Sequence, residues 1–165
     1  MSCRASKNIY WFVDSAYIGD DHPRTWNIDL GHPVMMPFEP SRHYNHSSSY
    51  EGTIEWESLA PENGLIYLGK ERRPFSISMF HQLRCLAVIR ERIINLPTDT
   101  AILEAAPDLL LHHCINYIRQ MVLCRADVTL EQAYTPPTGV KNNAQICNNW
   151  ERVYQEQKIN HKSAW

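Results

Sequence analysis

Two short segments of this sequence combine histidine with cysteine, the side chains best suited to acid–base chemistry, metal binding and thiol chemistry. The first segment reads His81-Gln-Leu-Arg-Cys85 and the second reads Leu110-Leu-His-His-Cys114. A histidine precedes the cysteine by four residues in the first segment and by one residue in the second. Because imidazole titrates near neutral pH, two such rings can act as general acid and base, or can hold a metal ion.

Both segments lie in stretches that have the apolar periodicity of an α-helix. The first predicted helix covers residues 76–96 and is ended by Pro97. The second covers about Asp108 to about Arg125. Both are apolar around most of their circumference, so we expect each helix to be buried against the other and against a layer of strands.

The remaining segments are predicted to be short strands, loops and one further helix. Thr53–Trp56 and Leu65–Leu68 are predicted to form a hairpin around the turn residues Pro61–Gly64. A last helix is expected over about Ile146–Gln157, with Trp150 and Val153 facing inward.

These elements predict one α+β domain over residues 1–165, in which buried helices pack on a small antiparallel sheet and much of the chain is irregular loop. Prolines separate the short apolar pieces of the N-terminal part, which predicts a loop and strand half over residues 1–75. The helical half then covers residues 76–165.

Composition excludes several classes of protein. The 165 residues include 16 Lys and Arg against 18 Asp and Glu, a net charge of -2, which argues against nucleic acid as a partner. No run approaches the roughly 18 apolar residues of a membrane span, so no span is expected in this chain. From the chain alone we expect a cytoplasmic protein, or one in the lumen of the secretory pathway if an N-terminal anchor has been removed.

The five cysteines leave two interpretations open. None of the spacings between Cys3, Cys85, Cys114, Cys124 and Cys147 is CxxC, which excludes a zinc ribbon and a thioredoxin-type motif. Two disulfides with a free Cys3, or five thiols in a reducing compartment, both fit this count.

The ordered set of motifs resembles the UstYa-like proteins of fungi. The motifs are Phe80-His-Gln-Leu-Arg-Cys-Leu86, His113-Cys-Ile-Asn-Tyr-Ile-Arg-Gln120 and Cys124-Arg-Ala-Asp127. Tyr17–Pro23, Glu55-Trp56 and Cys147 with Trp150 extend the resemblance to roughly residues 14–150. The resemblance implies a role in fungal secondary metabolism, including mycotoxin biosynthesis. It also implies a pair of HxxHC motifs that form a metal-dependent oxidase site, with copper as the favoured ion.

Three positions depart from the pattern that the resemblance implies. Arg84 replaces the second histidine of the first motif, Leu110 replaces the first histidine of the second, and Gln145 stands where relatives tend to have a histidine. A guanidinium has no lone pair to donate, and leucine has no donor atom. His112 is an imperfect substitute, because adjacent residues point about 100° apart on a helix. We therefore expect no metal and no other cofactor.

The first hypothesis is accordingly an enzyme that catalyses a metal-independent, non-redox cyclisation or isomerisation of a small hydrophobic molecule. His81 and His113 would be its general acid and base, with His112 beside them, and Arg84 would stabilise negative charge on an oxygen. The substrate would contact Trp56, Glu55 and Tyr117.

Two alternatives remain. One is a copper-dependent oxidase that uses His81, His112 and His113, and the other is a non-catalytic subunit that pairs with an intact relative. Either a homodimer or a heterodimer with a family member fits these readings. Structural roles are also open: Arg84 can pair with an acid such as Glu55, and Cys85 can pack against Cys114 or form a disulfide with it.

Overall fold

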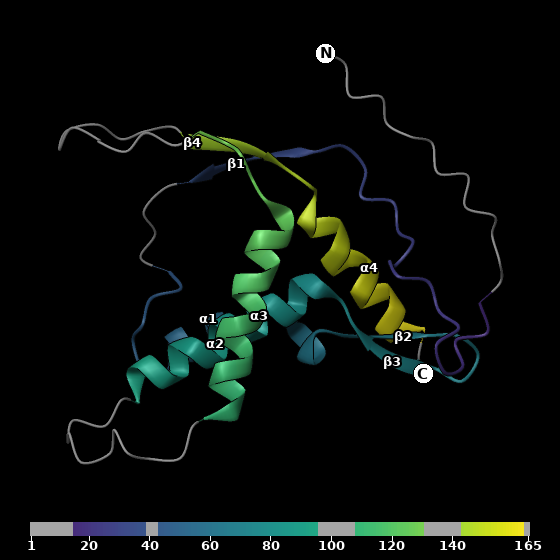
Figure 1. The fold of residues 1–165 in the computed structure, drawn as a ribbon, viewed down its shortest axis with the longest axis horizontal. Helices are drawn as coiled ribbons and strands as arrows, with labels where there is room; N and C mark the ends of the chain where they lie inside the picture. The colour runs from purple at the N-terminus through teal and green to yellow at the C-terminus, as the bar shows by residue number, and fades with distance from the viewer. Residues whose placement is uncertain (1–14, 39–42, 96–107, 131–142, 164–165) are drawn as a thin grey trace.

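The computed structural model describes residues 15–38, 43–95, 108–130 and 143–163 (Figure 1). The elements in chain order are β1 (Val34–Phe38), α1 (Tyr50–Ser58), the 3₁₀ turn η1 (Pro61–Gly64), β2 (Leu65–Leu68), β3 (Arg73–Ser76), α2 (Ser78–Ile94), α3 (Leu109–Arg125), β4 (Asn143–Cys147) and α4 (Trp150–Lys162). None of the helices in the described ranges is long and apolar enough to cross a membrane.

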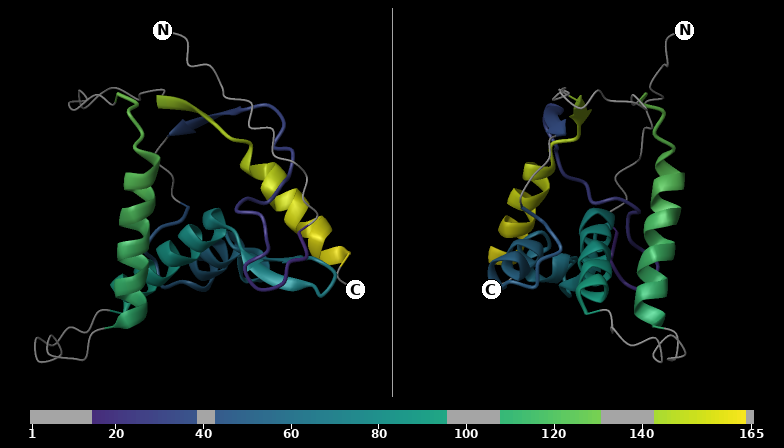
Figure 2. Two further views of the ribbon diagram at one scale, coloured as in Figure 1. Left: turned by 45° about the vertical axis from the view of Figure 1, so that its right-hand side comes forward. Right: turned by 90° about the vertical axis from the view of Figure 1, so that its left-hand side faces the viewer.

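The described strands form two separate antiparallel pairs. In one pair, β2 and β3 form a hairpin with Leu65 opposite Ser76. In the other, β1 pairs with β4, which lies far away in the sequence, with Val34 opposite Cys147. Figure 2 shows α3 and α4 on opposite sides of the molecule, with α2 and the hairpin near one end of both and the β1–β4 pair near the other. The predicted α+β class is confirmed.

The two central helices form where the periodicity predicts them. The helix predicted over residues 76–96 is α2 (78–94), and the second predicted helix is α3, which begins one residue after Asp108. The carboxylate of Asp108 caps α3 by accepting hydrogen bonds from the backbone N–H groups of Leu110 and Leu111. The helices pack against each other, but several apolar side chains of α3 are exposed in the structure: Leu109, Leu110, Ile115, Val122 and Leu123.

Two local predictions are wrong. Residues 53–56 belong to helix α1, because the hydroxyl of Ser49 caps the helix by accepting from the N–H of Gly52, and β2 pairs with β3 instead. The predicted last helix begins too early and ends too early. The chain is extended through Cys147, and Asn149 caps α4, which continues to Lys162.

The small core is centred on α2. Phe80 is completely buried, and Cys85 and Ile66 are almost so. The ring of Phe80 meets the ring of Tyr154 of α4 edge to face, with centroids 5.1 Å apart. Phe80 therefore joins α2 to α4.

Helix α4 docks on β2 through polar side chains that bond to backbone groups. The buried amide of Gln157 donates to the carbonyl oxygens of Pro61 and Leu65. The amide of Asn160 accepts from the N–H of Tyr67 at 2.7 Å and donates to the Tyr67 carbonyl at 2.8 Å. These side chains take the place of a neighbouring strand and satisfy an edge of β2 that faces the protein interior.

The packing of Phe80 requires glycine at position 64, because a larger residue there would overlap with the Phe80 side chain. Gly64 has a φ of +66°, and a Cβ there would lie 2.4 Å from the Cβ of Phe80. Gly31 has the same φ of +66° but nothing within 4 Å of an added Cβ. Substituting each of the two glycines therefore distinguishes the cost of a strained backbone, which both positions share, from the cost of steric overlap, which only position 64 has.

We expect Gly64→Ala to lower the free energy of unfolding by about 1–2 kcal/mol for the left-handed backbone and by about 1–3 kcal/mol more for overpacking against Phe80. Gly31→Ala is the matched control and should show only the backbone cost. Urea unfolding followed by circular dichroism measures both values. Equal losses in the two variants would contradict the packing assigned to Phe80.

Candidate functional site

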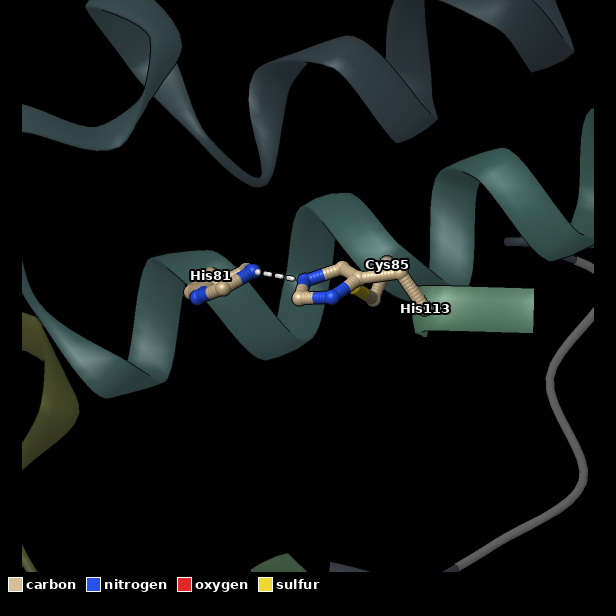
Figure 3. Close-up of side chains that lie close together, drawn as sticks. All are labelled: His81, Cys85 and His113. Carbon is tan, nitrogen blue, oxygen red and sulfur yellow. Dashed lines mark hydrogen bonds between the residues drawn. The ribbon is translucent and has the colours of Figure 1, made fainter. Parts of the chain in front are cut away.

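The packing of α2 on α3 brings the two predicted catalytic histidines into direct contact. The Nε2 atoms of His81 and His113 lie 3.3 Å apart, and the two rings are nearly parallel, with an interplanar angle of 19° (Figure 3). In such a contact one nitrogen donates and the other accepts, so at least one of the two rings must be protonated at this atom. The pair therefore joins a proton donor to a lone-pair donor across the helix interface.

Cys85 joins this pair as a third donor. One ligand atom from each of His81, Cys85 and His113 lies within 4.8 Å of the others. Cys85 is four residues after His81, so both side chains lie on the face of α2 that meets α3. The thiol is buried, His81 is half-buried and His113 is exposed, so the group is open on the His113 side.

Tyr117 fixes the ring of His81. Its ring stacks on the imidazole with centroids 4.0 Å apart, and its hydroxyl lies 3.1 Å from the Oγ atom of Ser78. The sequence predicted Tyr117 as a residue that lines a substrate pocket. The structure places it against His81, and it lines a cavity as well.

The surroundings favour the neutral forms of His81 and Cys85. Desolvation, followed by the nearby His113 and Arg84, lowers the pKa of His81 from its usual value. Burial and the neighbouring Cys114 raise the pKa of the Cys85 thiol to about 12. At neutral pH His81 therefore keeps a free lone pair, and Cys85 keeps its proton until another group displaces it.

Arg84 is directed toward η1, where its Nη1 atom donates to the carbonyl of Asn63 at 3.0 Å. The suggested pair of Arg84 with Glu55 is not formed. Glu55 instead pairs with His43 and accepts from the N–H of Tyr44, and these contacts lower the pKa of Glu55.

The other predicted substrate residue and His112 also lie apart from the histidine pair. Trp56 donates from its indole nitrogen to the carbonyl of Asn45, and it lines a cavity of about 760 Å³ between α1, η1 and α2. His112 is exposed on α3 and is not a member of the donor group that the described residues form. Sequence reasoning kept Cys85 among the candidate donors but favoured packing or a disulfide with Cys114 for it; its spacing of four residues from His81 was the signal for a shared site.

The comparisons with known proteins define the class. The sequence matches the family described as mycotoxin biosynthesis protein UstYa over residues 20–158, so the chain belongs to the UstYa family. No solved structure matches it.

Three fungal relatives are named as oxidases. The chain is 31% identical over 82 residues to the UstYa family oxidase phomYb of Diaporthe leptostromiformis, covering 47% of this chain and 32% of the relative. It is 39% identical over 61 residues to oxidase ustYa of Aspergillus flavus, covering 37% and 28%. It is 25% identical over 160 residues to oxidase ustYb of the same fungus, covering 71% and 60%. The chain thus spans less than two thirds of each of these relatives.

The hypothesis of a non-redox cyclase or isomerase is wrong, since these relatives are named as oxidases. That hypothesis rested on the loss of histidines at positions 84, 110 and 145. The loss of these histidines does not by itself exclude a metal-binding site, because donor atoms of His81, Cys85 and His113 still come together. The guanidinium of Arg84 donates to the carbonyl of Asn63.

The burial of Cys85 and Cys114 predicts a wide range of thiol reactivity. At pH 8 a thiol with a pKa of about 12 is roughly one part in ten thousand thiolate, and iodoacetamide also has to reach it. We expect Cys124, which is exposed, to be alkylated at least a hundredfold faster than Cys85 in the folded protein. Peptide mass spectrometry after timed alkylation measures both rates. Similar rates in the folded protein would contradict the burial described for the α2–α3 interface.

Proposed function

We propose that this chain is an oxidase of fungal secondary metabolism whose reaction centre is the donor group His81, Cys85 and His113. The observation that carries the proposal is the contact between the Nε2 atoms of His81 and His113. It joins two helices in a chain whose relatives are named oxidases. The substrate is proposed to be a small hydrophobic molecule.

The chemistry of the donor group fits a copper ion. Imidazole nitrogen and thiolate sulfur are ligands that copper prefers, and the three donor atoms lie within 4.8 Å of one another. The neutral state favoured for His81 leaves a nitrogen lone pair available. Cys85 would bind after losing its proton, as thiol ligands do when a metal binds. When bound, copper would supply one-electron redox chemistry and a site for dioxygen.

The remaining roles belong to the side chains of this chain. Tyr117 orients the His81 ring by stacking on it, and Ser78 fixes the Tyr117 hydroxyl. The buried side of the group, at Cys85 and Cys114, excludes water. The exposed side, at His113, leaves access for a substrate and for the proton that an oxidation releases.

We expect the purified chain to bind one copper ion, and His81→Ala and His113→Ala to weaken this binding by more than the roughly 10–100-fold that loss of a supporting residue costs. His112→Ala is the matched control, because His112 is adjacent to His113 but exposed and outside the group. Competition titration with a copper chelator gives the affinities, and the Cu(II) electron paramagnetic resonance spectrum reports nitrogen and sulfur ligation. Equal losses in all three variants would contradict the site.

The oxidase assignment is tested in the fungus that carries the gene. Replacing the gene with the His81→Ala allele should make a precursor accumulate that differs from the normal product by two hydrogen atoms or by one oxygen atom, as mass spectrometry of the metabolites reports. The His112→Ala allele should leave the profile unchanged. An unchanged profile with His81→Ala would contradict the oxidase and favour the non-catalytic subunit.

A further inference from the structure

A second cavity, of about 520 Å³, lies beside the histidine pair. Its walls come from the segment of residues 17–30, the β2–β3 hairpin, the start of α2, and one residue each of α3 and α4. This volume lies within the range of about 300–1,000 Å³ that is typical of ligand sites. We call it the hairpin cavity.

Tyr117 connects the hairpin cavity to the donor group. The residue forms part of the cavity wall, and its ring also stacks on His81 with centroids 4.0 Å apart. Ser78, which contacts the Tyr117 hydroxyl, lines the cavity too. The Tyr117 ring is therefore shared between the wall of the hairpin cavity and the stack on His81.

The lining is aromatic and aliphatic, with one permanent charge. Trp26 and Phe75 offer flat faces, and Phe75 is itself held edge to face by Tyr17 and His22, at centroid distances of 6.1 and 5.1 Å. The permanent charge is the guanidinium of Arg24, and no carboxylate lines the cavity. Within the described ranges, no ion pair involves Arg24.

The cavity near Trp56 has a different charge. It is lined by three glutamates, and its two arginines, Arg84 and Arg90, already bond to backbone carbonyls. An apolar molecule with an anionic group is therefore better matched to the hairpin cavity, where the cation has no partner of opposite charge among the described residues.

We propose that the hairpin cavity is the substrate-binding site of the donor group, and that it takes an aromatic carboxylic acid whose ring packs against Trp26 and Phe75 and whose carboxylate pairs with Arg24. Its role as the substrate site rests on the proposed oxidase function. Its capacity to bind such acids does not. Tyr117 is then a positioning residue between the bound ring and His81.

The test uses two probes of the same shape, 3-phenylpropionate and 3-phenylpropanol, with the metal-free full chain. Ligand-detected NMR titration should show that the acid binds about three to five times more tightly than the alcohol, as expected for an exposed ion pair. Arg24→Gln should abolish this preference, whereas Arg125→Gln, which changes an exposed arginine at the end of α3, should keep it. Thr25→Trp, which places a large ring at an exposed position of the wall, should weaken binding of both probes.

Equal affinity for the two probes, or a preference that survives Arg24→Gln, would overturn the proposal. Circular dichroism of each variant shows whether it is folded, and Arg24→Gln alters an exposed side chain, so its result stands even if Thr25→Trp misfolds.

Loading the protein with Cu(II) then separates this proposal from the oxidase. Paramagnetic broadening of the bound probe is expected in the wild type and should disappear with His81→Ala. Probe binding without copper binding would refute the oxidase and leave the carboxylate site in place. Copper binding without broadening would overturn the hairpin cavity as the substrate site.

Discussion

The burial of Phe80 between η1 and α4 is the constraint on which the candidate site depends. Phe80 and Arg84 are four residues apart and face η1, where Gly64 leaves room for the ring and Asn63 accepts from the guanidinium. His81 and Cys85 are likewise four residues apart, and contact α3 through His113 and Cys114. Fixing the rotation of α2 with Phe80 therefore also fixes which side chains meet α3. Helix α2 thus presents two separate faces, one to η1 and one to α3.

The two donors that α2 contributes to the α2–α3 interface, His81 and Cys85, are favoured in their uncharged forms. Burying an unpaired charge would cost several kcal/mol, and the interface avoids this cost because desolvation lowers the pKa of His81 and raises that of Cys85. The neutral imidazole of His81 and the neutral thiol of Cys85 can therefore face α3 before any cation is present. Like charges would instead push the helices apart.

The sequence predicted the central helices well and the rest less well. The prediction of helix α3 from its apolar periodicity agrees with the structure to within about a residue at its start, where Asp108 caps the helix. The meeting of His81 with His113 was implied by the resemblance to the UstYa-like proteins, whereas the apolar periodicity predicted only that the two helices pack on each other. Helix α1 was missed because the capping hydroxyl of Ser49 outweighed the strand preference of Thr53 and Ile54. Helix α4 docks through amides, which apolar periodicity does not detect.

The polar docking of α4 also bears on the hairpin cavity, because β2, which forms part of its wall, is hydrogen-bonded to α4. The side-chain amide of Asn160 bonds to both the N–H and the carbonyl of Tyr67, so hydrogen bonds hold β2 against α4. The hairpin also contacts the N-terminal segment: Arg73 donates to the carbonyl of Gly19, and the turn at Gly69 passes so close to Tyr17 that a Cβ there would lie 2.6 Å from the Cβ of Tyr17. The hairpin is thus tied to α4 on one side and to the N-terminal segment on the other. Because the walls are positioned before a ligand arrives, little binding energy is spent on ordering them, and even a small aromatic acid can bind measurably.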